Sequence, residues 1–209
     1  MKHSMESKNK VNLYLIAGSV GLILLTAASL FIGKYRITLT GLIAGDSMQW
    51  RVFLTLRASR AVIGAIGGFV LGMAGFVYQT VFRNPLASPD IIGVSSGASA
   101  GAAFGILFLS GSMAITVSAF AGAVCSVILA LVLSSLTADR DGHSIVLAGI
   151  AVHSLAQTAL VCLKLIADPE KQLASIEYWI MGSLNGISIY SIKGNIILCL
   201  FCSVILFLL

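Results

Sequence analysis

The sequence predicts an all-α polytopic membrane protein, built as a bundle of about six spanning helices. Three observations support this fold class: an apolar composition, long charge-free runs, and glycines that recur every four residues. Of the 209 residues, 58% are apolar and only 10% are charged, a balance that ordinary soluble domains do not show. We expect a short N-terminal tail over residues 1–10 and a transmembrane domain over 11–209, apparently truncated at its C-terminus.

The charge-free runs place the helices in order. A spanning helix needs about 20 mostly apolar residues, and the candidate runs are 11–33, 61–82, 91–138, 144–163 and 196–209. The run 91–138 must hold two helices, because one helix of that length would exceed twice the roughly 30 Å hydrocarbon core. Ser110, Gly111 and Ser112 supply the turn between them. The first run exceeds the roughly 7–15 residues of a signal core, which favours a retained helix.

Two ladders of glycine predict close helix packing. Small residues at four-residue intervals form a flat stripe along a helix, and such stripes let backbones approach within a bilayer. The stripes consist of Gly64, Gly68 and Gly72 in one segment and Gly93, Gly97, Gly101 and Gly105 in another.

The loop between the first two spans carries a pair of arginines. Residues 34–60 are too polar to span, and pieces 40–44 and 48–56 suit short interfacial helices. If the end of this loop is helical, the three-residue spacing puts Arg57 and Arg60 on one side. Guanidinium groups bind carboxylates bidentately, so the pair could receive an acidic partner protein. The alternative is that both arginines reach toward lipid phosphates.

Two proline-containing segments read as turns that start helices. Ser88 fits an N-cap, Pro89 a first helical position, and Asp90 complements the positive helix end. This irregular segment must face water or line a cavity, since such backbone is not tolerated against lipid. Residues 168–170 repeat the signal for a short interfacial helix that runs to Met181 and stops at Gly182.

Counting basic residues does not decide the orientation. With a cytoplasmic N-terminus, each side of the membrane carries a comparable set of cations, so the positive-inside rule does not favour that topology. The inner set would be Lys2, Lys8, Lys10, Arg83 and Arg140, and the outer set Lys34, Arg36, Arg51, Arg57 and Arg60.

Four blocks of sequence, in order, carry a resemblance to a known family. They are Arg57 and Arg60; Gln79 with residues 82–87 and Pro89; residues 93–98; and residues 147–151 with Trp179 and 181–184. Over about residues 56–186 the chain resembles the permease subunits of bacterial ABC importers for iron–siderophore complexes, haem and cobalamin. Where that family usually has Leu-Pro between the arginines, this chain has Ala58 and Ser59.

The resemblance implies a protein of about ten spanning helices in the bacterial inner membrane, with its N-terminus inside and no cofactor or metal. Its expected partners are membrane lipid, a second permease subunit, cytoplasmic ATP-binding subunits and an extracytoplasmic substrate-binding protein. The expected cargo is an iron(III)–siderophore complex, with haem or cobalamin as alternatives. Arg57 and Arg60 would dock the binding protein, and the inner gate would comprise Asn84, Pro85, Leu86, Gly142 and His143.

Two functions of other classes are weaker alternatives. Residues 93–97 satisfy the G-x-S-x-G pattern, and His153 follows on a later helix, as an intramembrane serine hydrolase would need. However, a nucleophile elbow requires a strand before the turn, and no acid is placed to orient the histidine. A passive channel would also use glycine-packed helices. The four cysteines lie in apolar runs and lack the pattern of a metal or redox site, and no basic face suggests nucleic-acid binding.

Overall fold

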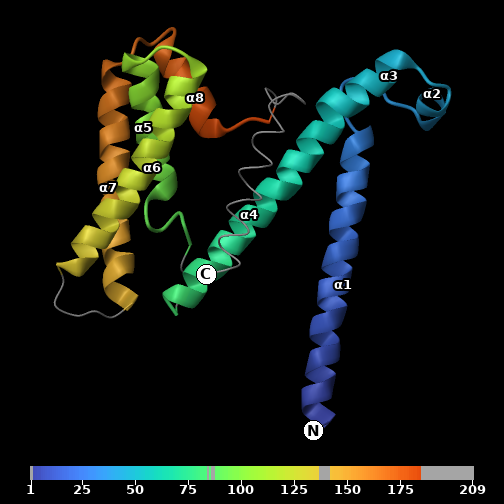
Figure 1. Ribbon diagram of the computed structural model, residues 1–209, viewed down its shortest axis with the longest axis horizontal. Helices are drawn as coiled ribbons and strands as arrows, with labels where there is room; N and C mark the ends of the chain where they lie inside the picture. The colour runs from blue at the N-terminus through green and yellow to red at the C-terminus, as the bar shows by residue number, and fades with distance from the viewer. Residues whose placement is uncertain (1, 84, 86–87, 137–141, 185–209) are drawn as a thin grey trace. The chain divides into compact units, whose positions relative to one another are not determined.

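The computed structural model describes residues 2–83, 85, 88–136 and 142–184, and over these residues it is all-α (Figure 1). The described residues fall into two compact units, residues 2–68 with Leu184 and residues 69–183. We describe each unit by itself. The all-α fold class predicted from the sequence is confirmed.

The first unit contains a long helix followed by a folded loop. Helix α1 (Lys2–Phe31) includes the residues expected as a tail. The loop then forms α2 (Leu39–Ile43), α3 (Ser47–Val52) and the π-helix η1 (Phe53–Ala58), which leads into α4 (Ser59–Val81). The two short interfacial pieces predicted from the sequence are therefore present within a few residues of their expected bounds. Together α3, η1 and α4 make one apolar helical stretch from Ser47 to Val81.

The second unit is a helix bundle. Helices α5 (Val94–Phe108), α6 (Ser112–Ser135) and α7 (Gly142–Ile166) contact one another in all three pairs, and α8 (Gln172–Met181) contacts α5. Figure 1 shows α5, α6 and α7 side by side. Every buried apolar residue of the described chain except Ile37 lies between Ile92 and Ile176. The hydrophobic core therefore belongs to this bundle.

Within the part of the chain that the structure describes, four helical stretches are long and apolar enough to cross a membrane: Asn12–Phe31, Ser47–Val81, Ser112–Ser135 and Ser144–Ile166. Helix α5 is apolar but shorter. The apolar run 196–209, expected as a sixth span, lies outside the described residues. The chain is thus a multi-pass membrane protein.

Two turns and a helix end that the sequence predicted are present in the structure. Gly111 precedes α6 with a φ of 100°, a left-handed conformation that glycine adopts readily, so the predicted turn is confirmed. Asp168 accepts hydrogen bonds from the backbone N–H groups of Glu170 and Lys171, and Gly182 ends α8 as expected.

The helix start expected at Ser88, Pro89 and Asp90 is wrong. The backbone N–H of Ile91 donates to Ser88 and that of Gly93 donates to Asp90, which closes successive turns rather than a helix. Helix α5 begins at Val94, after Gly93 with a φ of 84°. A Cβ at Gly93 would lie 3.1 Å from the backbone nitrogen of His153 on α7. The left-handed turn thus lets the chain pass close to α7 before the helix starts.

Candidate functional site

The first unit brings the two predicted docking arginines to one cavity. Arg57 lies in η1 and Arg60 in the first turn of α4. Both line a cavity of about 770 Å³, together with Lys34, Tyr35 and apolar residues that include Leu56. The described lining contains three cationic side chains and no acidic one. Such a cavity favours an anionic group.

Arg57 also makes contacts within the protein. Its guanidinium donates hydrogen bonds to the backbone carbonyl of Ile32 and, at 3.0 Å, to that of Tyr35. Ile32 follows the last residue of α1, so these bonds join η1 to the end of α1. The sequence pattern did not reveal this contact, because the partners lie more than 20 positions away and are backbone atoms.

A π-helical turn sets the direction of Arg57. In a π-helix the hydrogen bonds span five residues, so each turn holds more residues than in an α-helix. The hydroxyl of Ser59 reinforces this turn by donating to the carbonyl of Leu54 at 3.0 Å. The expected three-residue spacing assumed a regular α-helix, whereas the chain changes from π to α between Arg57 and Arg60.

Polar side chains organise the rest of this loop. Asp46 caps α3 by accepting from the backbone N–H groups of Met48 (2.9 Å) and Gln49 (3.3 Å). The hydrogen bonds from these two N–H groups hold the pKa of Asp46 below its ordinary value, because they stabilise the carboxylate, and the bond from Gln49 has the larger effect. Gln49 accepts from the backbone N–H of Thr38, and the indole of Trp50 donates to the carbonyl of Leu42. The loop is therefore a folded support for the cavity.

The predicted inner hinge is described only in part. Asn84 and Leu86 lie outside the described residues, Pro85 is exposed in a turn, and Gly142 with His143 forms the first turn of α7. Arg83, which follows α4, has a φ of 48°, an uncommon conformation for a residue with a side chain.

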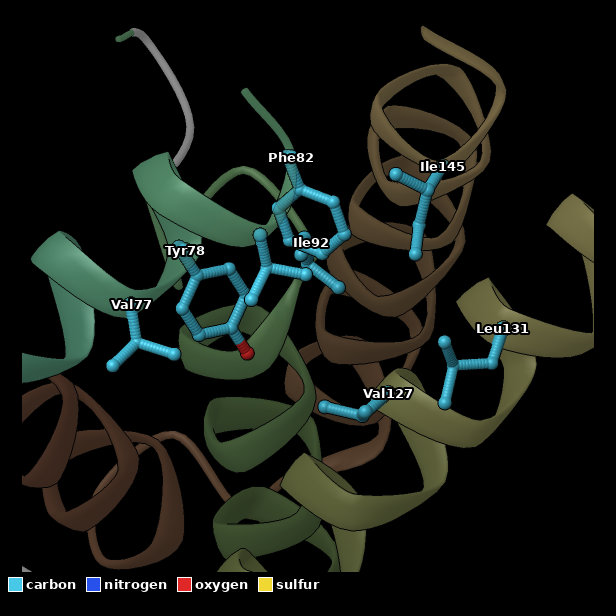
Figure 2. A pocket seen from close by; sticks show the side chains of 8 residues that line it. Val77, Tyr78, Phe82, Ile92, Val127, Leu131 and Ile145 are labelled. Carbon is cyan, nitrogen blue, oxygen red and sulfur yellow. The ribbon is translucent and has the colours of Figure 1, made fainter. Parts of the chain in front are cut away.

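An apolar cavity of about 230 Å³ lies next to the described part of the hinge (Figure 2). Its walls come from the end of α4, the turn before α5, and helices α6 and α7, with Tyr78, Ile92, Val127 and Ile145 among the lining residues. The rings of Tyr78 and Phe82 pack at 5.5 Å between centroids. The end of α4 thus meets the bundle through side chains without charge.

The two glycine ladders have different surroundings. In α5, a Cβ at Gly97 would lie 2.6 Å from the carbonyl oxygen of Gly122, and one at Gly105 would lie 3.0 Å from Ile115 Cα, both on α6. In α4, Gly64 has only Leu184 nearby, at 3.9 Å. Gly68 and Gly72 have no atom within 4 Å in the described part of the chain.

The G-x-S-x-G segment lacks the setting of a nucleophile elbow. Ser95 is exposed in the first turn of α5, and the described residues before it form turns rather than a strand. A strained strand-to-helix turn is what projects the serine of such hydrolases.

Comparison with known proteins gives consistent matches. The sequence profile of the FecCD transport family matches residues 21–209. A hemin transport system permease of Yersinia pestis is 33% identical over 154 residues, which make up 71% of this chain and 45% of the relative. A cobalamin import system permease of Halobacterium salinarum is 35% identical over 133 residues, or 63% of this chain and 36% of the relative.

A solved structure of an ABC transporter of the metal-chelate type, in an inward-facing conformation, is similar with a TM-score of 0.79 at 28% identity. The alignment covers 93% of this chain and 61% of that one. The chain spans about half the length of the curated relatives it matches.

Proposed function

The chain belongs to the FecCD transport family, and on this premise we propose that it is the transmembrane permease subunit of a binding-protein-dependent ABC importer. The family match over residues 21–209 carries the proposal. The similarity to a metal-chelate ABC transporter at a TM-score of 0.79 supports it. The subunit would form the translocation pathway and carry out no chemistry of its own.

The energy for transport would come from other subunits. The sequence has no GxxxxGK[ST] loop of the kind that cradles ATP phosphates. Two cytoplasmic ATP-binding subunits would therefore drive the cycle, each nucleotide state favouring a different conformation of a permease dimer. An extracytoplasmic binding protein would deliver the cargo.

We assign an iron(III)–siderophore complex as the cargo. The relatives named above are permeases for hemin and for cobalamin, so haem and cobalamin are the competing assignments. All three are bulky chelates. A pathway for them has to bind loosely enough to release its cargo, as small and weakly polar linings do.

In the bacterial inner membrane, the proposed topology places the N-terminus in the cytoplasm. The cavity with Arg57 and Arg60 then faces outward and the hinge at Pro85 faces inward, because the two sites flank opposite ends of α4. Asn84, Leu86, Gly142 and His143 would complete the inner gate. Cysteine labelling tests this topology. Ser59 is buried, so the exposed Ser47 is the better position for a cysteine on the outer side. A Ser47→Cys variant should react with an impermeant thiol reagent added outside the cell, and a Pro85→Cys variant should not.

The cavity supplies the physical basis for docking. Lys34, Arg57 and Arg60 line it together, and a cluster of like charges attracts carboxylates on a partner. Such complementarity acts mainly on the association rate and orientation, and it weakens with ionic strength.

Uptake measurements test the cargo and the mechanism. Cells lacking this protein should lose uptake of a radiolabelled iron(III)–siderophore complex while retaining uptake of hemin and cyanocobalamin. Loss of hemin or cobalamin uptake instead would reassign the cargo. Uptake that persists when the partner ATPase is inactivated would favour a passive channel.

Charge reversal tests the docking site. Arg57→Glu with Arg60→Glu should lower the association rate of the binding protein by about tenfold at low salt and flatten its salt dependence, since electrostatic steering is lost. Arg51→Glu is the matched control, because Arg51 is an exposed arginine of the same loop that does not line the cavity. Equal binding by both variants would place docking elsewhere.

A further inference from the structure

We propose that Arg57 is a positioning residue that ties the end of α1 to η1, and that its contribution to docking runs through this tie. The structural part of the proposal stands on hydrogen bonds and space within the first unit. Its consequence for docking rests on the proposed function.

The end of α1 needs a positive group. The last carbonyls of a helix have no partner within it and carry a partial negative charge. No basic residue occurs in the last turn of α1. Arg57 brings a positive charge there from η1 by donating to the carbonyl of Ile32, which follows the last residue of α1, and to that of Tyr35 in the loop beyond it.

Gly33 leaves the space that this contact requires. A Cβ built on Gly33 would collide with the guanidinium of Arg57, whose Cζ and two terminal nitrogens are its three nearest neighbours. No other atom of the described chain lies nearer to that Cβ position. The glycine and the arginine therefore form one structural unit.

The tie lies where α1 meets the rest of the first unit. None of the apolar window of α1 is buried by the described residues, and among the described elements η1 is the main neighbour of α1. Phe31 and Phe53 pack at the same junction, with ring centroids 6.5 Å apart. The Arg57 hydrogen bonds are thus a large part of what fixes the end of α1.

The chemistry of the contact favours arginine over lysine. A guanidinium presents several N–H donors in a rigid plane, so it can reach two carbonyls at once, whereas an ammonium is a compact point charge. Because Arg60 follows within one turn and lines the same cavity, the orientation that Arg57 gives η1 is passed on to Arg60.

Hydrogen exchange of the full chain in lipid nanodiscs tests the tie without any partner. In Arg57→Gln and in Gly33→Ala, backbone amides of residues 28–32, whose hydrogen bonds form the end of α1, should exchange about tenfold faster than in the wild type. Arg51→Gln is the control for the loss of a positive charge elsewhere in the same loop. Gly45→Ala controls for backbone strain, because Gly45 also has a positive φ but open space around it.

The double variant Gly33→Ala/Arg57→Gln should exchange no faster than either single variant, since all three lack the same contact. Arg57→Lys should exchange nearly as fast as Arg57→Gln. Unchanged exchange in both single variants, or additive effects in the double, would overturn the tie.

Measurements of docking distinguish a positioning role of Arg57 from a direct contact between Arg57 and the binding protein. If Arg57 acts by positioning, Gly33→Ala should weaken binding of the extracytoplasmic binding protein as much as Arg57→Gln does, although it keeps the charge. Weakening by Arg57→Gln alone would make Arg57 a contact residue and refute the inference. Failure of the wild type to bind would refute the proposed function and leave the exchange result standing.

Discussion

The loop between α1 and α4 and the α5–α6–α7 bundle are stabilised in different ways. In the loop, side chains bond to backbone: Asp46 caps α3, Trp50 donates to Leu42, and Arg57 donates to the end of α1. In the bundle, the backbones of α5 and α6 approach each other closely at glycines. Nearly all the buried apolar residues of the described chain also lie in this unit. In a polar loop, hydrogen bonds within the protein have to replace hydrogen bonds to water, whereas helices in lipid are stabilised by the van der Waals contacts of close packing.

The glycine ladders sharpen this contrast, since they look alike in sequence. In α5 the ladder faces α6 at contact distance, while Gly68 and Gly72 of α4 have open space within the described structure. A ladder therefore indicates a face able to pack. It does not indicate which element packs there.

A large effect is expected from a single added methyl group, in Gly101→Ala. A Cβ at Gly101 would collide with the carbonyl oxygen of Ser118 and lie 3.2 Å from the Cα of Ala119. Backbone atoms cannot move aside as a flexible side chain can, so the free energy of unfolding should fall by about 1–3 kcal/mol or more. Gly72→Ala is the matched control and should change it by less than about 1 kcal/mol. Thermal unfolding in nanodiscs would measure both.

Replacement of Gly68 by Leu tests the open ladder more severely. The described structure offers no atom within 4 Å of that position, so Gly68→Leu should fold normally, whereas Gly97→Leu should fail to fold. Size-exclusion chromatography and protease resistance would distinguish the two variants. A misfolded Gly68→Leu variant would demonstrate that the α4 ladder packs as well, and the contrast would disappear.

A smaller effect is expected from Ser118→Ala. The Ser118 hydroxyl donates to the carbonyl of Gly101 at 2.6 Å and links α6 to α5. Hydrogen bonds between membrane helices contribute about 0.6 kcal/mol on average, so the melting temperature should fall only slightly. Ser112→Ala, at the exposed start of α6, serves as the comparison. A loss as large as that of Gly101→Ala would mean that hydrogen bonds, rather than close approach, hold the bundle.

The smallest effect concerns the loop and its pH dependence. Because the backbone donors lower the pKa of Asp46 in the folded loop, its capping stabilises the fold at neutral pH. This contribution is lost as the pH falls below about 4 and the carboxylate is protonated. Fluorescence of Trp50, followed in a Trp179→Phe background, should report a transition in acid that Asp46→Asn removes.

Much of the fold could be predicted because its signals are local. Charge-free runs located the spanning helices, and Gly111 and Gly182 marked a turn and a helix end through the conformations that glycine allows. Asp168 was recognised as a capping residue because a carboxylate can accept from the backbone N–H groups that follow it, although the turn that it caps precedes α8, which begins at Gln172.

Contacts distant in sequence could not be predicted. Ser88, Pro89 and Asp90 have the local preferences of a helix start, yet the close approach of Gly93 to His153 delays α5 until Val94. Arg57 and Arg60 were singled out together and both line one cavity, but a residue pattern cannot reveal the hydrogen bonds from Arg57 to backbone carbonyls after α1. The docking and gating roles of these residues remain predictions.

The shortness of α5 has a consequence for how this protein senses its membrane. With 15 residues against 24 in α6, α5 rises about 22 Å, less than the roughly 30 Å hydrocarbon thickness. Hydrophobic mismatch cannot be relieved by tilting a helix that is already too short. Acyl-chain length should therefore act on α6 and α7 directly, and on α5 through its packing against them, at its glycines on α6 and in the apolar cluster that its Ala103 forms with Leu160 of α7.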